Sequence, residues 1–260
     1  MLRDLQRRKA RGRRGLALVE GVRLVEEALS AGLKFRGALV TPDLDRTARG
    51  YALRADLERH AVPVEEISVR ALERLADTES PQGIVAVIEP RKWRADELAL
   101  GERGVVLVID GVQDPGNVGT LLRTAHALGA AGTIVLRGTA DVLSPKALRA
   151  AMGATFRHPI ASLDDGAFIT WARKTAVTLW AAAADGVPLH RALERPGRGK
   201  KAEKGAGPIA VIVGNEGAGI RPQLNAVATQ RVAIPLAQGA ESLNVAVAAG
   251  ILLYEVLRGR

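Results

Sequence analysis

Short apolar runs alternate with segments of helical spacing along most of the chain. In the first third, runs typical of β-strands fall at 36–40, 62–66 and 84–88, and helical patterns fall at 20–31, 48–59 and 69–76. Such alternation is typical of a sheet covered by helices. The first third therefore predicts a small α/β domain.

The rest of the chain repeats this alternation with longer apolar runs. Strands are expected at 105–109, 133–136, 177–182, 208–213 and 231–234, and helices at 117–128, 145–152, 167–174, 221–228 and 242–257. Strands that alternate with helices favour a mostly parallel sheet with helices on both faces. The predicted fold class is α/β throughout, with a larger C-terminal domain.

Domain boundaries follow from composition. Residues 89–104, EPRKWRADELALGERG, are charged and poorly periodic, as is typical of a linker. We therefore predict a basic tail at 1–14, an N-terminal domain at 15–90, a linker at 91–104 and a C-terminal domain at 105–260.

Three polar, glycine-rich segments each follow a predicted strand. They are DGVQDPGNVGT after Ile109, GNEGAGI after Val213 and PLAQGAESLN after Ile234. In an open parallel sheet, ligands bind outside the carboxyl ends of the strands. One such loop would be ordinary turn chemistry. Three at the same edge of a sheet predict a ligand site.

The chain carries 37 Lys and Arg against 28 Asp and Glu, a formal net charge of +9. This excess favours a polyanionic partner, because each neutralised phosphate releases counterions. Two basic runs, at 3–14 and 195–204, concentrate the charge. Each is interpreted as a solvated, disordered segment or as an arm that grips a nucleic-acid backbone, and both can be true together. A loop at 197–207, rich in Gly and Lys, is expected to lie on the surface.

The residue types exclude several classes of site. The chain has no cysteine, which rules out disulfides, thiolate metal sites and cysteine nucleophiles. Its four histidines lack metal-ligand spacing, so we expect no metal. GNEGAG departs from the dinucleotide fingerprint and no P-loop occurs, which disfavours a small-molecule nucleotide-binding enzyme. Because no apolar run could span a bilayer and no signal-peptide pattern follows the basic start, we expect a cytoplasmic protein with no membrane segment.

Three segments carry a resemblance to a known family. DPGNVGTLLRTAHALGAAG, IVGNEGAGI and RVAIPLAQGAESLNVAVAAGILLYEVL resemble, in order, spacing and strand context, the motifs of SpoU-type (TrmH-type) RNA 2′-O-ribose methyltransferases. These enzymes belong to the α/β-knot (SPOUT) superfamily. In LVEGVRLVEEAL and TESPQGIVAVI, the N-terminal part is similar to the substrate-binding domain that precedes this catalytic domain, a fold like that of an RNA-binding ribosomal protein.

The resemblance implies a parallel-sheet catalytic domain with a deep trefoil knot, preceded by an RNA-binding domain. It also implies S-adenosylmethionine (SAM) as cofactor, RNA as partner, and a homodimer formed through the C-terminal domain. By position in the motifs, Gly214, Ile234 and Leu243 match the residues that cradle the cofactor, and Leu236 and Asn244 lie close by.

The resemblance implies a catalytic set as well. Asn117 and Arg123 match the first motif, Glu216 the second, and Ser242 with Asn244 the third. The reaction would be an in-line attack of a ribose 2′-oxygen on the methyl carbon, which needs alignment and stabilisation of charge. A guanidinium is a poor proton acceptor, so we expect Arg123 to hold the 2′-oxygen or a phosphate rather than to act as a base.

Each of these residues also has a purely structural interpretation. Asn117 and Ser242 are good helix caps, Glu216 is an ordinary loop carboxylate, and Arg123 is an ordinary surface cation. In the segment 144–160, Ala150 and Ala151 stand where many relatives have Ala-Ser, which weakens any role for that serine.

The last predicted helix carries a stripe of residues with two interpretations. The stripe is either core packing or part of a dimer interface. It consists of Val245, Ala249, Leu252 and Val256.

The sequence therefore predicts a SAM-dependent methyltransferase acting on a ribose 2′-hydroxyl of structured RNA. Ribosomal RNA is the expected substrate because of the type of N-terminal domain. The alternatives are a transfer RNA ribose methyltransferase and a catalytically silent RNA-binding assembly factor with the same fold.

Overall fold

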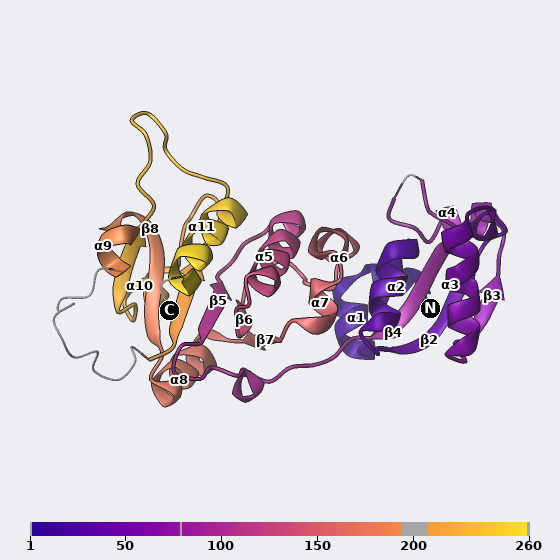
Figure 1. Ribbon diagram of the computed structural model, residues 1–260, viewed down its shortest axis with the longest axis horizontal. Helices are drawn as coiled ribbons and strands as arrows, with labels where there is room; N and C mark the ends of the chain where they lie inside the picture. Colours follow the sequence, from indigo (N-terminus) through magenta and orange to yellow (C-terminus); the bar gives the residue numbers. More distant parts are fainter. Residues whose placement is uncertain (1, 79, 194–206, 259–260) are drawn as a thin grey trace. The chain divides into compact units, whose positions relative to one another are not determined.

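The computed structural model describes residues 2–78, 80–193 and 207–258 (Figure 1). The basic run at 195–204, and all but the last residue of the loop predicted at 197–207, lie outside these ranges. The chain forms two compact units. The N-terminal unit is Met1–Arg91 with Asp141–Arg157, and the C-terminal unit is Lys92–Ala140 with His158–Arg260.

The N-terminal unit is built on a mixed four-stranded sheet in the order β1-β4-β2-β3. Its strands are β1 (Ala17–Glu20), β2 (Lys34–Val40), β3 (Val64–Glu66) and β4 (Ile84–Glu89). Strand β4 runs antiparallel to β1 and β2, while β2 and β3 are parallel. The sequence prediction missed β1, which is only four residues long.

Helices cover both faces of this sheet. They are α1 (Arg8–Arg14), α2 (Val22–Ser30), α3 (Ala48–Arg59), α4 (Val69–Glu73), α6 (Pro145–Ala151) and α7 (Ala154–Arg157), with 3-10 turns η1 (Leu2–Gln6) and η2 (Leu44–Arg46). Strand residues that alternate in sequence face opposite layers. Ala17 and Val19 join the core under α2 and α3, while Leu18 joins a second cluster with Leu5 and Leu72.

The basic start of the chain is folded rather than disordered over the described residues. Leu5 is fully buried, and Arg11 is only 4% exposed. The Arg11 guanidinium donates to the carbonyl oxygens of Leu5 (2.8 Å) and Gln6 (2.7 Å), and its Nε donates to Asp141 (2.9 Å). The apolar positions between the charges anchor this segment in the unit, so the disordered interpretation is wrong here.

Residues 141–157 pack within the N-terminal unit, although the sequence analysis assigned them to the C-terminal domain. Leu148 and Phe156 belong to the core beneath α2 and α3. Arg157 also donates to the Glu27 carboxylate at 2.6 Å. The segment therefore belongs with β1 and α2 by packing, even though it follows β6 in the chain.

The C-terminal unit is a six-stranded sheet in the order β10-β8-β9-β5-β6-β7. The strands are β5 (Val105–Ile109), β6 (Gly132–Leu136), β7 (Ile160–Leu163), β8 (Thr178–Pro188), β9 (Ile209–Val213) and β10 (Gln230–Ala233). All neighbouring pairs are parallel. This confirms the predicted α/β class with a parallel sheet. Only β7 was not predicted.

Both faces of this sheet are covered, which explains why β5 and β9 are buried along their whole length. The helices are α5 (Pro115–Ala127), α8 (Asp165–Thr175), α9 (Leu189–Leu193), α10 (Pro222–Asn225) and α11 (Val245–Arg258), with a 3-10 turn η3 (Ala95–Glu97). Helix α11 packs against α5, β5 and β9, while residues of α8 and α10 join the core on the other face.

Three of the four residues in the predicted stripe on the last helix are core, while Val245 is partly exposed. Ala249, Leu252 and Val256 are at most 1% exposed, so they are not available to a partner. None of the helices that the structure describes could cross a membrane, because none is both long and apolar enough.

Candidate active site

Helix α5 begins two residues earlier than predicted, at Pro115. Asp114 is its cap, because the Asp114 carboxylate accepts from the Asn117 backbone amide at 2.9 Å. The structural interpretation of Asn117 as a cap is therefore wrong. Its side chain is left to make other contacts.

Helix α11 begins at Val245, three residues later than predicted. The Asn244 side-chain oxygen accepts from the Ala246 amide at 2.9 Å. Asn244 is thus the cap of this helix, and the interpretation of Ser242 as its cap is wrong. Ser242 is exposed in the preceding loop.

Residues from all three motifs meet in one hydrogen-bonded chain. The Asn117 Nδ2 group donates to Glu216 Oε1 at 3.0 Å. The Asn244 Nδ2 group donates to Asn117 Oδ1, also at 3.0 Å. Both polar atoms of the Asn117 amide are used, so its orientation is determined. Segments 127 residues apart in sequence are joined through one side chain.

Glu216 is held as a carboxylate. Partial burial by itself would raise the pKa of Glu216, but hydrogen bonds from Asn117 and from backbone amides outweigh it, and the pKa lies below its ordinary value. The Gln113 amide contributes one of these bonds, to Oε2 at 3.3 Å. Because both carboxylate oxygens accept hydrogen bonds, Glu216 orients its neighbours at neutral pH.

A cavity of about 440 Å³ lies beside this chain of hydrogen bonds. All five predicted cofactor residues line it, together with Glu216 and Ser242. The five are Gly214, Ile234, Leu236, Leu243 and Asn244. Its walls come from the loops after β9 and β10, from β8 and from α11, at the edge that the parallel sheet predicts.

Gly214 occupies a position where only glycine fits. A Cβ atom there would lie 2.2 Å from the Gly219 carbonyl carbon and 2.4 Å from the Ile220 nitrogen. The loop folds back on itself, because Asn215 and Gly219 exchange two backbone hydrogen bonds of 3.0 Å. Backbone rather than side chain therefore forms this side of the cavity.

Asn215 fastens this loop to the first motif, a role that the sequence analysis missed. Its side-chain amide donates to the Gly111 carbonyl at 3.0 Å. Its oxygen accepts from the amides of Gly217 and Ala218, both at 2.9 Å. Asparagine is frequent at turns for this reason, and that preference was the available signal.

A buried ion pair fastens the end of the same loop. Asp110, directly after β5, is fully buried and accepts from the Arg221 amide (2.8 Å) and from Arg221 Nε (2.6 Å). Arg221 also grips Asp165 with two bonds of 2.8 and 2.7 Å. Partial burial would raise the pKa of Asp165, but hydrogen bonds from Gln223 and Arg221 lower it. The sequence analysis did not predict this network, although an acidic residue directly after a buried strand could have indicated it.

Of the predicted residues, only Arg123 neither lines the cavity nor forms a hydrogen bond with a residue that lines it. It is exposed on α5 and does not line the cavity. It lies six residues beyond Asn117, which rotates it about 120° around the helix. Among the described residues, Arg123 makes no hydrogen bond or ion pair with the motif residues, so its role stays a prediction.

The chain matches two family models. The model described as the SpoU rRNA Methylase family matches residues 104–254. The model of the MRM3-like substrate binding domain matches residues 1–86. A curated relative from Bacillus subtilis, the 23S rRNA (guanosine(2553)-2′-O)-methyltransferase RlmP, is 35% identical over 99% of this chain and 94% of its own length.

Solved structures agree with these matches. An AdoMet-bound rRNA methyltransferase from Sinorhizobium meliloti superposes with a TM-score of 0.82 at 31% identity, covering 99% of this chain and 92% of its own. The SpoU methyltransferase AviRb from Streptomyces viridochromogenes, in complex with AdoMet, gives 0.83 at 30% identity, covering 99% and 95%.

Proposed function

Because the chain belongs to the SpoU rRNA methylase family, we propose that it transfers a methyl group from SAM to a ribose 2′-hydroxyl of ribosomal RNA. One observation carries this proposal. Seven of the nine predicted site residues line a single cavity, and an eighth, Asn117, bonds directly to two of these seven. Arg123 stands outside this group.

The cavity fits the cofactor. Its volume of about 440 Å³ lies within the range of roughly 300–1,000 Å³ that is usual for small-molecule sites. Ile234, Leu236 and Leu243 provide apolar wall, and the backbone at Gly214 permits close approach. When bound, SAM supplies an electrophilic methyl carbon.

The residues of the chain would then act by alignment. Glu216 holds Asn117, and Asn117 holds Asn244 at the start of α11. These bonds fix the polar groups at the rim of the cavity before RNA binds. Polar groups that are already oriented lower the activation barrier of methyl transfer. Ser242, exposed on the rim, offers a hydroxyl to the incoming ribose.

We assign Arg123 to the RNA rather than to the cofactor. Its guanidinium is exposed on α5, so its fork of donors is available to a phosphate or to the 2′-oxygen. Since a guanidinium does not accept protons at neutral pH, the hydroxyl proton leaves to water rather than to Arg123.

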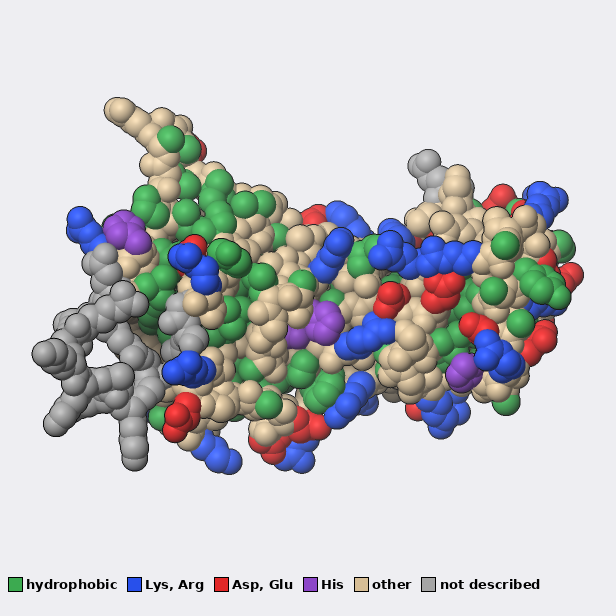
Figure 2. All heavy atoms as spheres, in the orientation of Figure 1, with side chains coloured by type: hydrophobic (Ala, Val, Ile, Leu, Met, Phe, Trp, Pro, Cys, Tyr) green, Lys and Arg blue, Asp and Glu red, His purple; other side chains and the backbone are tan. Residues whose placement is uncertain are grey.

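We propose that two copies pair through α11. Val247, Ile251 and Tyr254 form an exposed stripe on this helix, at 52%, 37% and 52% exposure. Hydrophobic side chains gather over this part of the surface in Figure 2. An isologous pair would cover the stripe on both copies. The stripe differs from the buried one that the sequence analysis named.

The remaining expectations rest on the family. The trefoil knot is proposed for this chain because its fold matches those of SpoU enzymes. A ribosomal RNA substrate is met in the cytoplasm, and we propose this as the place of action.

The test is transfer of labelled methyl from SAM to ribosomal RNA, followed by mapping of the 2′-O-methylated nucleotide. We expect labelling of rRNA with wild-type protein, and loss of labelling with Arg123→Ala at unchanged SAM affinity. Labelling of transfer RNA alone would overturn the proposed substrate. Absence of SAM binding in calorimetry would instead indicate the silent assembly factor.

A further inference from the structure

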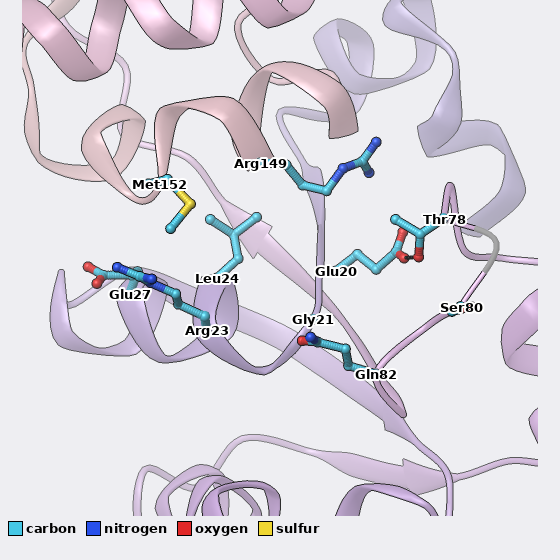
Figure 3. Close-up of a pocket in the computed structure, with 10 residues that line it drawn as sticks. All are labelled: Glu20, Gly21, Arg23, Leu24, Glu27, Thr78, Ser80, Gln82, Arg149 and Met152. Atoms are coloured by element: carbon cyan, nitrogen blue, oxygen red, sulfur yellow. Dashed lines mark hydrogen bonds between the residues drawn. The ribbon is translucent and has the colours of Figure 1, made fainter.

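The N-terminal unit contains a cavity of about 280 Å³ that the proposed chemistry does not use. It lies between the turn from β1 to α2, the segment before β4, and helix α6 (Figure 3). Eight of its ten lining residues come from LVEGVRLVEEAL and TESPQGIVAVI. All ten belong to one compact unit.

Apolar side chains form part of the wall. Leu24 on α2 is only 8% exposed, and Met152 follows α6. In Figure 3 the two lie close together on one side of the cavity. Flat aromatic rings, such as nucleobases, pack well on such surfaces, and sequence-specific proteins bind unstacked RNA bases in this way.

A fixed carboxylate stands on the opposite side. Glu20 accepts from the Asp77 backbone amide at 2.7 Å and from the Thr78 hydroxyl. These bonds hold the side chain in one orientation. An ionised carboxylate only accepts hydrogen bonds, so it requires donors from any ligand.

Two donors complete the wall. The Gln82 side-chain oxygen accepts from the Val22 amide at 3.1 Å, which orients the amide and leaves its Nε2 hydrogens for a ligand. Arg149 donates through Nη2 to Asp77 at 2.7 Å. Its Nη1 atom is buried and has no hydrogen-bond partner among the described residues. Because this atom is buried, a ligand in the cavity does not reach it unless the Arg149 side chain moves.

We propose that this cavity binds an unstacked guanine of the RNA substrate, an inference that rests on the proposed function. Guanine presents two adjacent N–H donors, which a carboxylate accepts together, beside a carbonyl oxygen that the Gln82 amide can bind. Adenine and the pyrimidines do not present this set of groups on one edge. A phosphate offers no N–H donor to the Glu20 carboxylate, and Glu20 with Glu27 balances the charge of Arg23 and Arg149 in the lining.

The first experiment measures binding of single nucleotides to the full chain, saturated with SAM so that the C-terminal cavity is occupied. Saturation-transfer NMR with GMP, AMP, CMP and UMP should show contact for GMP and at least about fivefold less for the others. The GMP signal should disappear in Glu20→Gln, which replaces one acceptor by a donor at equal size. Equal signals for all four nucleotides would overturn the inference.

The matched control is Glu26→Gln. Glu26 lies on α2, six residues beyond Glu20, pairs with Arg49 and does not line the cavity. This variant should bind GMP as the wild type does. Ser80→Trp supplies a second disruption, because Ser80 lines the cavity and is exposed. Retention of the GMP signal in both Glu20→Gln and Ser80→Trp would also overturn the inference.

The second experiment uses a 23S rRNA transcript as methyl acceptor. Glu20→Gln should raise the KM for RNA about tenfold, with the Kd for SAM unchanged. If wild-type protein transfers no methyl group to RNA, the proposed function fails, whatever the cavity does. If wild type is active and Glu20→Gln has the same KM for RNA, only the guanine site fails.

Discussion

The two cavities described above have walls of different composition. In the C-terminal unit, glycine backbone, small residues and apolar side chains form much of the wall. In the N-terminal unit, four of the ten lining residues are charged: Glu20, Arg23, Glu27 and Arg149. A wall of backbone is set by the fold and suits one cofactor. A wall of side chains can be altered by single substitutions and suits a substrate that differs between enzymes.

The two units also share a structural feature, an Arg–Asp ion pair between distant residues. Each holds a segment in place with a buried Arg–Asp pair that links residues more than 100 positions apart: Arg11 with Asp141, and Arg221 with Asp110. The first pair fixes the segment 141–157 in the N-terminal unit. The second fixes the loop after β9, which lines the C-terminal cavity. The segment 141–157 contributes side chains to the N-terminal cavity, whereas the loop after β9 contributes mainly backbone to the C-terminal cavity.

The largest effect should come from the backbone wall. In Gly214→Ala, the new Cβ would overlap the backbone at Gly219 and Ile220, and we expect SAM affinity to fall by at least about 100-fold in calorimetry. Gly217→Ala in the same loop is the control, since its Cβ would meet no atom closer than 3.7 Å. Equal SAM affinities in the two variants would contradict the idea that backbone at Gly214 forms the wall of the SAM site.

Removal of the anchoring cation should come next. Arg221→Met leaves Asp110 buried without its side-chain partner, and we expect a loss of about 3–5 kcal/mol in the free energy of unfolding, measured with urea. The exposed pair of Arg231 with Asp185 is the comparison, and Arg231→Met should cost less than about 1 kcal/mol. A cost that small for Arg221→Met would show that the pair does not anchor the loop.

The loss of stability of the C-terminal unit at acid pH should depend on His158. Burial, together with the nearby His126, lowers the pKa of His158 to about 4. The folded state therefore keeps this imidazole neutral, while the unfolded chain binds the proton below about pH 6.5. Stability should fall by ~3 kcal/mol as pH drops from about 6.5 to 4.

His158→Gln should flatten this part of the stability profile, whereas His60→Gln, at an exposed position, should leave it unchanged. Urea denaturation between pH 4 and pH 7 measures both. An identical slope in His158→Gln and wild type would assign the acid sensitivity to other groups.

A smaller effect is expected from the hydrogen-bonded chain beside the cofactor cavity. Asn117→Asp replaces the donor to Glu216 by a second carboxylate, and the pKa of Glu216 should rise. We expect kcat for methyl transfer to fall about 10- to 100-fold, with little change in SAM affinity. Gln113→Ala is the control, because Gln113 contacts Glu216 only through its backbone amide. Equal kcat values would remove Asn117 from the catalytic set.

The smallest effect concerns the exposed cations of the N-terminal unit. Residues 2–14 cannot simply be deleted as a test of RNA binding, because Leu5 and Arg11 are part of the core. Changing the exposed Arg7, Lys9 and Arg13 to Gln should instead lower rRNA affinity severalfold and reduce the slope of log K against log salt by up to about 2. An unaltered slope would mean that α1 does not contact RNA.

The hydrophobic pattern predicted the position of most elements, because continuous apolar runs mark the fully buried strands and apolar residues at helical spacing mark the helices. The run Val105–Ile109 and the helix Ala48–Arg59 were predicted to the residue. The short strands β1 and β7 escaped notice because four residues carry too little pattern. The capping residues were misassigned because Asp114, Asn117, Ser242 and Asn244 are all good caps. Only backbone geometry selects among them.

The sequence alone determined the α/β class and the order of the three motifs, because each depends on residue types along the chain. Its resemblance to a known family also named residues that line the C-terminal cavity. The tertiary structure decided that Asn117 links Glu216 to Asn244, that Arg221 neutralises Asp110, and that residues 141–157 pack beside α2. These pairings join positions about 100 or more residues apart, and local sequence does not encode which distant partner satisfies a buried polar group.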